Sequence, residues 1–151
     1  MNRRSLFLAP LALMLVPLGA ARVRARSYTL GAIEIGHPWA EPTTGDVAAV
    51  FMALANMGAK ADRLASAATP IADTVLFQEY GNQPVAAFDL LPKQPVALRP
   101  GGRHIVLQGL KQRLVVGDGF PLTLRFAVAG STTIIVQVEH GAAQPPPSPA
   151  H

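Results

Sequence analysis

Cysteine is absent from the 151-residue sequence. The chain therefore cannot form a disulfide, hold a metal through thiolates, or use a thiol as a nucleophile or redox group. Aromatic residues are also few, with one Trp, two Tyr and six Phe. A chain of this length is expected to form one domain, and without disulfides its stability has to come from a hydrophobic core.

The sequence also lacks the motifs of the common enzyme classes. It contains no G-x-S-x-G, no H-E-x-x-H, no phosphate-binding loop and no dinucleotide-binding glycine pattern. Its nine acidic residues are scattered, and their spacing pairs no two of them as an acid–base couple. We therefore expect that the protein is not an enzyme.

Positive charge is concentrated at the start of the chain. Thirteen Lys and Arg face nine Asp and Glu, but five of the arginines lie at positions 3, 4, 22, 24 and 26. From residue 27 onward, eight basic residues face all nine acidic ones, and no Lys/Arg cluster is interleaved with aromatic residues. This distribution argues against nucleic-acid binding.

The first 26 residues have the layout of a signal peptide. Arg3 and Arg4 precede an uncharged apolar run, residues 5–18, and small residues follow at 19–21 and at Ala25. The pattern predicts export by the Sec or the twin-arginine route, with cleavage near residue 21 or 25. A membrane anchor is the alternative, but the run is short and contains two prolines. At the other end, the Pro-rich residues 141–151 predict a disordered tail.

Residues 27–140 have the pattern of short strands separated by turns. In residues 121–128, PLTLRFAV, Leu and Phe alternate with other residues up to Val128, as in a half-buried strand. Residues 47–56, VAAVFMALAN, fit a strand buried on both faces or a helix, and the flanking turns favour a strand. Further strands are predicted at 28–35, 62–69, 73–80, 103–110 and 131–140, with short pieces near 85–90 and 95–99. No amphipathic helix is evident, so we predict an all-β antiparallel sandwich or Greek-key barrel.

His104 is the most informative candidate ligand, because it begins a strand directly after the turn Pro100-Gly101-Gly102. Residues two apart share one face of a strand, so His104, Val106 and Gln108 are predicted to point away from the core. Residues 105 and 107 would point inward. A histidine at the rim of a sandwich suits a metal ligand, but one imidazole needs further donors.

The other histidines carry no local metal signature. His37, His140 and His151 could join His104 in an imidazole-rich site for Cu(II) or Zn(II), or they could be ordinary edge and tail residues. Trp39, the only tryptophan, fits an anchor at the edge of the core better than a platform for a ligand.

Three stretches of the sequence resemble the periplasmic copper chaperone family PCu(A)C, also called DUF461. They read HPWAEPTTGDVAAVFMALANMG, ADRLASAATPIADTVLFQEY and LRPGGRHIVLQGLKQRLVVGDGFPLTLRF, and the last is the most specific. The resemblance covers about residues 28–139. It implies a cupredoxin-like antiparallel Greek-key β-sandwich over residues 27–140, a periplasmic location, and copper as the bound metal.

The resemblance also implies a Cu(I) site of two histidines and two methionines, of which this sequence retains one ligand in four. His104 stands at one histidine position, and Gln78 aligns with the other. The methionine positions after His104 are occupied by Val106 and Gln108, and residues 81–92, where a further methionine would lie, contain none. Valine offers no donor atom, and a carboxamide oxygen suits Cu(I) poorly. Met52 and Met57 match no ligand position.

Two functions stay open on this basis. The first is an exported copper-handling protein that delivers or buffers copper for a cuproenzyme or another copper chaperone, with His104 as the retained metal ligand. The second is a copper-independent periplasmic interaction module, derived from the same family, that uses Gln78, His104, Val106 and Gln108 as a partner surface.

Overall fold

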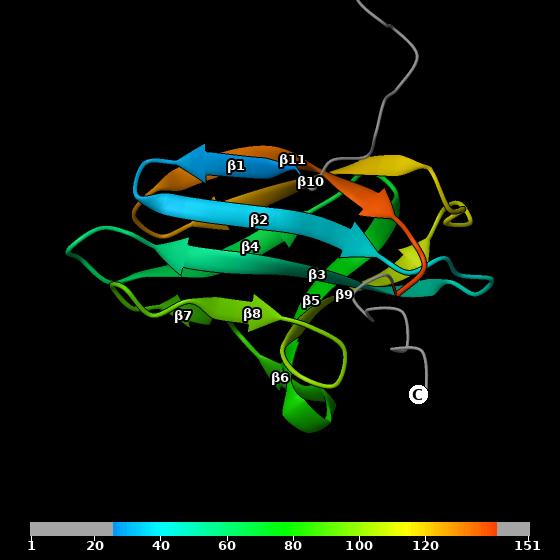
Figure 1. Ribbon diagram of the computed structural model, residues 1–151. Helices are drawn as coiled ribbons and strands as arrows, with labels where there is room; N and C mark the ends of the chain where they lie inside the picture. Colours follow the sequence, from blue (N-terminus) through cyan, green and yellow to red (C-terminus); the bar gives the residue numbers. More distant parts are fainter. Residues whose placement is uncertain (1–25, 142–151) are drawn as a thin grey trace, which may run out of the picture.

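The computed structural model describes residues 26–141, and nearly all of this segment is β-structure (Figure 1). The strands are β1 (Ser27–Leu30), β2 (Ile33–Ala40), β3 (Val47–Asn56), β4 (Asp62–Ala68), β5 (Ala72–Glu79), β6 (Gln83–Val85), β7 (Phe88–Leu90), β8 (Val96–Leu98), β9 (His104–Leu110), β10 (Gly119–Phe126) and β11 (Gly130–Val138). A single 3-10 turn, η1 (Tyr80–Asn82), joins β5 to β6. The predicted leader up to residue 25, and the tail from residue 142, lie outside the described residues, so these two predictions and the exact domain limits stay predictions.

The strands form one hydrogen-bonded sheet that curls around a common core. Its order is β6-β5-β9-β3-β2-β11-β10-β4-β7, with β1 beside β2 and β8 beside β3. Every paired strand runs antiparallel to its neighbour except β11 and β2, which are parallel where Gln137 meets Trp39 and Val138 meets Ala40. The all-β sandwich prediction is confirmed, with one parallel pair that the sequence pattern did not indicate.

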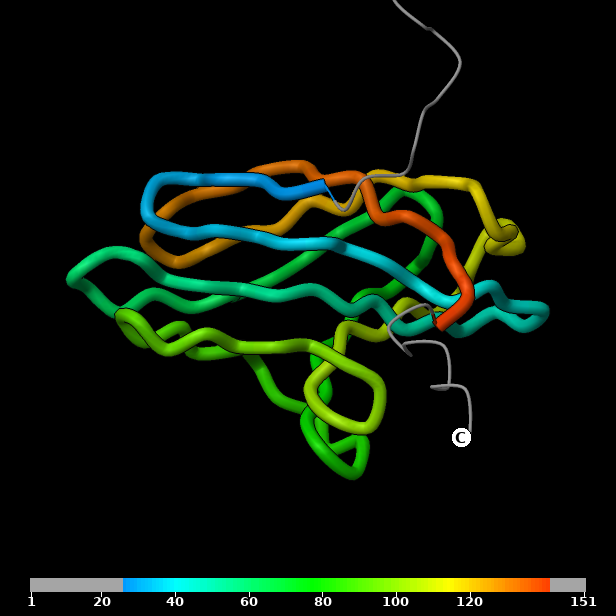
Figure 2. Tube along the Cα trace, viewed as in Figure 1, coloured from blue at the N-terminus to red at the C-terminus, as the bar shows by residue number. Residues whose placement is uncertain are grey.

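The parallel pair brings the two ends of the described chain together. Figure 2 shows the N-terminal strands and the C-terminal strand running side by side. Strand β11 lies between β2 and β10, so the last strand of the chain occupies the middle of the sheet.

The predicted strand positions are largely confirmed, and two of them need correction. Residues 28–35 are not one strand but the hairpin β1–β2, because Gly31 adopts a φ of 55° and turns the chain. Val128 does not continue the buried row of β10, since it follows the end of that strand and is 65% exposed. The core row of β10 therefore ends at Phe126, which is buried.

The two faces of β9 differ, and this difference positions the candidate site. Ile105 and Leu107 point inward and are fully buried, as the strand alternation predicted. On the opposite face His104 is half-buried and Gln108 is exposed, while Val106 is buried. Because β9 is paired on both sides, with β5 and with β3, this outer face is flanked by two further strands.

Asp62 is a buried carboxylate that supports the turn between β10 and β11. Its Oδ1 accepts hydrogen bonds from the N–H groups of Val128 at 2.8 Å and Arg63 at 2.7 Å, and its Oδ2 accepts one from Ala129 at 2.9 Å. Three backbone donors thus satisfy the buried carboxylate.

No helix of the described residues is long and apolar enough to cross a membrane.

Candidate metal centre at the start of strand β9

A tight turn fixes the position of His104. Gly101 adopts a φ of 81°, a conformation that glycine tolerates best. The Gly102 N–H donates to the Arg99 carbonyl at 3.0 Å, and the Arg99 N–H donates to the Arg103 carbonyl at 2.9 Å. The chain then enters β9 at His104, directly opposite Gln78 of β5 in the strand register.

The imidazole of His104 is held at both ring nitrogens. Its Nδ1 lies 2.8 Å from the Gly102 carbonyl oxygen and its Nε2 lies 3.0 Å from Oε1 of Gln78. In a neutral ring whose Nδ1–H donates to the Gly102 carbonyl, Nε2 carries no hydrogen and can only accept a hydrogen bond. The Gln78 carboxamide must then turn its NH2 group, and not its oxygen, toward Nε2. An Nδ1–H bond to a backbone carbonyl is the usual support of a metal-ligating histidine, and it leaves Nε2 as the atom that would bind.

Two aromatic rings follow His104 across the outer face of the sheet. The Phe51 ring centroid lies 6.4 Å from that of His104, and the Trp39 centroid lies 4.7 Å from that of Phe51. Trp39 and Phe51 are both buried. Trp39 is buried, as an anchor would be, but it lies outside the core cluster and packs on Phe51, whose ring separates it from His104.

The remaining ligand positions line a hollow of about 450 Å³ beside His104. Val106 stands opposite Ala49 of β3, and Gln108 stands opposite Val47. Gln78, Gln108 and Asn82 of η1 also line this hollow and contribute carboxamide side chains. Among residues 26–141, His104 is the one lining side chain that can carry a charge. We refer to this feature as the uncharged hollow.

No methionine accompanies His104 within residues 26–141. Met52 is buried at 2% exposure on the inward face of β3, and Met57 is 58% exposed in the turn that follows this strand. The two thioethers implied by the resemblance are thus missing from the structure around His104 as well as from the aligned sequence positions.

The imidazole-rich alternative is wrong for the histidines that the structure describes. Nε2 of His37 lies 2.5 Å from Oε1 of Glu139, a close contact that lacks hydrogen-bond geometry. His140 is exposed just beyond β11. Within residues 26–141, no three His, Asp or Glu side chains are grouped so that they could hold a metal ion. His151 lies outside the described residues.

The donor set around His104 therefore does not fit the Cu(I) site that the resemblance implies. It offers one imidazole and three carboxamides, and the carboxamide oxygen is a hard donor whereas Cu(I) prefers thioether, thiolate and imidazole. What the structure does show is that Gln78 and His104, the two aligned histidine positions, meet across β5 and β9.

Sequence reasoning did not identify Asn82, Val47 and Ala49 as part of this surface. Asn82 belongs to a 3-10 turn whose place in space is set by β5 and β6. Val47 and Ala49 sit in a continuous apolar run, so period-2 alternation could not separate their outward positions from the inward Ala48 and Val50.

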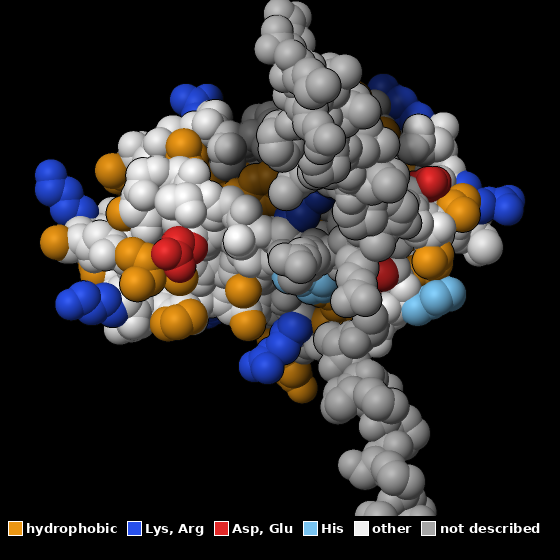
Figure 3. Space-filling view, turned by 45° about the horizontal axis from the view of Figure 1, so that its top comes forward, with side chains coloured by type: hydrophobic (Ala, Val, Ile, Leu, Met, Phe, Trp, Pro, Cys, Tyr) orange, Lys and Arg blue, Asp and Glu red, His pale blue; other side chains and the backbone are white. Residues whose placement is uncertain are grey.

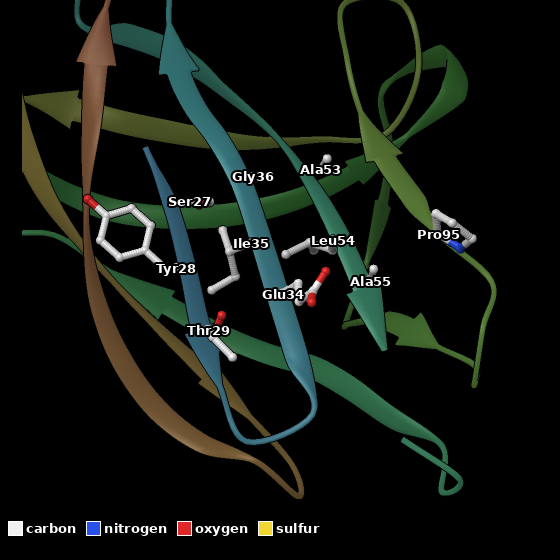
Figure 4. Close-up of a pocket in the computed structure, with 10 residues that line it drawn as sticks. All are labelled: Ser27, Tyr28, Thr29, Glu34, Ile35, Gly36, Ala53, Leu54, Ala55 and Pro95. Carbon is white, nitrogen blue, oxygen red and sulfur yellow. The ribbon is translucent and has the colours of Figure 1, made fainter. Parts of the chain in front are cut away.

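A second, smaller hollow of about 320 Å³ lies over β1, β2 and β3, away from His104 (Figure 4). Its floor includes the small residues Gly36 and Ala53, and Glu34 is its only charged side chain. Tyr28 turns toward β11, where its hydroxyl oxygen accepts a hydrogen bond from the Ile135 N–H at 3.0 Å. This hollow offers no group of donors for a metal.

On the face that Figure 3 shows, Lys and Arg side chains lie mostly singly at the margins and form no continuous basic patch. Three surface pairs join basic and acidic side chains, of which Arg103 with Glu79, at 3.5 Å, is the one nearest His104 in sequence.

Comparison with known proteins gives consistent matches. Residues 33–138 match the family described as "Putative lipoprotein LpqE-like". By sequence, no curated protein matches the chain. Among solved structures, a copper-bound PCuAC domain from PmoF2 shares 30% identity with a TM-score of 0.72, and the match covers 76% of this chain and 98% of that one. The apo PCuAC domain from PmoF1 shares 26% identity with the same TM-score, over 76% of this chain and 99% of that one.

A more distant match supports the fold alone. The solution structure of Cu(I)-DR1885 from Deinococcus radiodurans is 22% identical, with a TM-score of 0.61, over 76% of this chain and 81% of that one. The family match spans well over half of the chain, and the closely similar folds are PCuAC domains. The chain therefore belongs to the LpqE-like family and has the PCuAC fold.

Proposed function

We propose that the chain is an exported copper-handling protein that retains His104 as its one family copper ligand and does not hold Cu(I) tightly by itself. The observation that carries this proposal is the contact between Gln78 and His104. The two side chains occupy the aligned histidine positions and meet at 3.0 Å, but only one of them is an imidazole.

The orientation of the His104 ring supports a role in metal binding. The Nδ1 bond to Gly102 directs Nε2 toward the position that a second ligand would share. Copper would bind at Nε2 only if the Gln78 carboxamide moved aside. A copper-protein partner, such as a cuproenzyme or another copper chaperone, would then have to supply the soft donors that this chain lacks.

The expected affinity is low. Loss of even an outer-shell partner weakens metal binding by about 10–100-fold, so the absence of three direct ligands is expected to cost at least about 10³-fold. Export is supported by the predicted signal peptide in residues 1–26 and by the lipoprotein description of the matching family.

A competition titration tests this proposal. The protein would be titrated with Cu(I) against a coloured Cu(I) chelator, beside His104→Ala and a control, His140→Ala, in an exposed residue beyond β11. We expect weak competition by the wild type, a further loss in His104→Ala, and no change in His140→Ala. Tight stoichiometric binding by the wild type would contradict the incomplete site.

The copper-independent interaction module is the second candidate. It is favoured by the uncharged hollow, where an apolar side chain, Val106, stands at a ligand position. Equal, negligible Cu(I) binding by the wild type and by His104→Ala would support this candidate, and it would contradict binding of Cu(I) by His104 in the isolated chain.

A further inference from the structure

The uncharged hollow lies on the outer face of the sheet over β5, β9 and β3, and it combines aliphatic and polar side chains. Val47 is 52% exposed beside it, and Leu76, which stands opposite Val106, is 37% exposed. Val and Ala side chains line it, together with three carboxamides and the imidazole of His104. Such a surface favours an uncharged segment that is apolar and rich in hydrogen-bond acceptors.

The chain continues past the described residues from a point close to this hollow. After β11, the Glu139 N–H donates to the Ala40 carbonyl at 2.9 Å. In the strand register Ala40 stands level with Val50, and Val50 stands level with Ile105. The chain therefore leaves the sheet two strands away from the hollow, a separation of about 10 Å at the usual strand spacing.

The segment that follows has the chemistry that the hollow suits. Residues 142–150 read AAQPPPSPA and contain no charged residue. We propose that this Pro-rich segment binds in the uncharged hollow in an extended polyproline II conformation. At about 3.1 Å per residue, nine residues span about 28 Å, which is ample to cross two strands and cover the hollow.

Hydrogen bonding favours the same occupant. Polyproline II has no internal hydrogen bonds, so its carbonyl oxygens need external donors, and proline contributes no N–H that would need an acceptor. Asn82 and Gln108, which line the hollow, each carry two N–H donors, and Gln78 keeps one beyond its bond to His104. Pro-rich segments dock against apolar and aromatic grooves because they lose little conformational entropy on binding.

Binding of this segment would cover His104 from the side on which a copper-protein partner would approach. The segment then competes with a partner for the same face of β9. The docking itself does not depend on copper, so it can be tested separately from the proposed function.

A spin label tests the docking directly, since the chain has no cysteine. In the full chain, Ser148→Cys introduces a single thiol for a nitroxide label. We expect the label to reduce the amide NMR peak intensities of Val47, Ala49 and Val106 much more than those of the β10–β11 turn, which contains Val128.

Matched variants decide whether the hollow itself is responsible. Val47→Lys places a charge in the hollow, and Val128→Lys makes the same change at a similarly exposed valine in the β10–β11 turn. We expect the intensity loss to disappear in the first variant and to persist in the second. Pro146→Asp, which leaves residues 26–141 unchanged, should abolish it as well.

Three outcomes would overturn the proposal. The first is an intensity loss spread evenly over the domain, and the second is a loss that survives both Val47→Lys and Pro146→Asp. The third outcome concerns a mixture in which one chain carries the nitroxide and another chain, without nitroxide, carries the isotope label. If the peaks of the isotope-labelled chain lose as much intensity as in the single-chain experiment, the segment binds the hollow of a second copy and not its own.

Discussion

At the scale of single residues, Gln78 decides how the site behaves. Its carboxamide meets Nε2 of His104 at 3.0 Å, the atom that a metal would use. The hydrogen bond from Gln78 gives Nε2 of His104 a neutral partner at the position where a metal ion would bind. The pairing gives Nε2 of His104 a hydrogen-bond partner without a second imidazole or a metal ion.

Adding soft donors beside His104 should raise the affinity of the protein for Cu(I). Gln78→His would place a second imidazole opposite His104, and Val106→Met would add a thioether on the same face of β9. We expect the double variant to bind Cu(I) at least about 10²-fold more tightly than the wild type, if each added ligand contributes about 10-fold or more. The chelator competition described above measures this.

A control for that gain is the pair Gln83→His and Val85→Met. Both lie on β6 beside β5, but neither lines the hollow. This control should not raise the affinity. An equal gain in both double variants would mean that any added soft donor suffices, and that the Gln78–His104 position is not special.

The site was predictable from the sequence only in part. The turn glycines and the period-2 alternation placed His104, Ile105 and Leu107 correctly, because both signals are local. The contact between Gln78 and His104 joins residues 26 positions apart, and the alignment with the family indicated it where spacing could not. The ring hydrogen bonds depend on the turn geometry around Gly102, which no sequence pattern specifies.

At the scale of secondary-structure elements, turns at the sheet ends rely on buried polar side chains. Asp62, at the start of β4, holds the β10–β11 turn through Val128 and Ala129. Asn56, at the end of β3, donates from Nδ2 to the carbonyls of Lys60 and Leu90 and accepts from the Gly58 N–H. The strand pattern predicted β3 and β4 but not these links, because a single Asp or Asn looks the same in a sequence whether buried or exposed.

Removing the Asp62 carboxylate should therefore destabilise the domain. Asp62→Ala leaves the N–H groups of Val128 and Ala129 without their acceptor, and we expect a loss of about 2–3 kcal/mol in the free energy of unfolding. Asp89→Ala is the matched control, since Asp89 forms only an exposed pair with Arg63 at 3.4 Å. The control should change stability by about 0.5 kcal/mol or less. Urea unfolding of both variants measures the difference, and equal losses would contradict a special role for Asp62.

At the scale of the whole molecule, the fold depends on the pairing of its last strand, β11, with β2 and β10. Without a disulfide, the sheet is closed by the contacts of β11 with β2 and β10. Three inward side chains of β11, Ile134, Val136 and Val138, are buried almost completely. The all-β class was predictable because each strand has its own alternation, whereas the parallel β2–β11 pair was not, because register between distant strands leaves no local trace.

This arrangement predicts that the domain cannot fold until its last strand is present. Burial of the three inward side chains of β11 contributes about 5–9 kcal/mol, comparable to the whole stability of a domain this size. A chain that stops at residue 129 should therefore show no cooperative unfolding by circular dichroism.

Deletion of β1, residues 27–30, removes a strand that lies outside the main sheet order and should leave a folded, less stable domain. The β1 deletion is the control, because it removes a strand without removing β11. A cooperative transition in the chain that lacks β11 would mean that the remaining strands form a core without it.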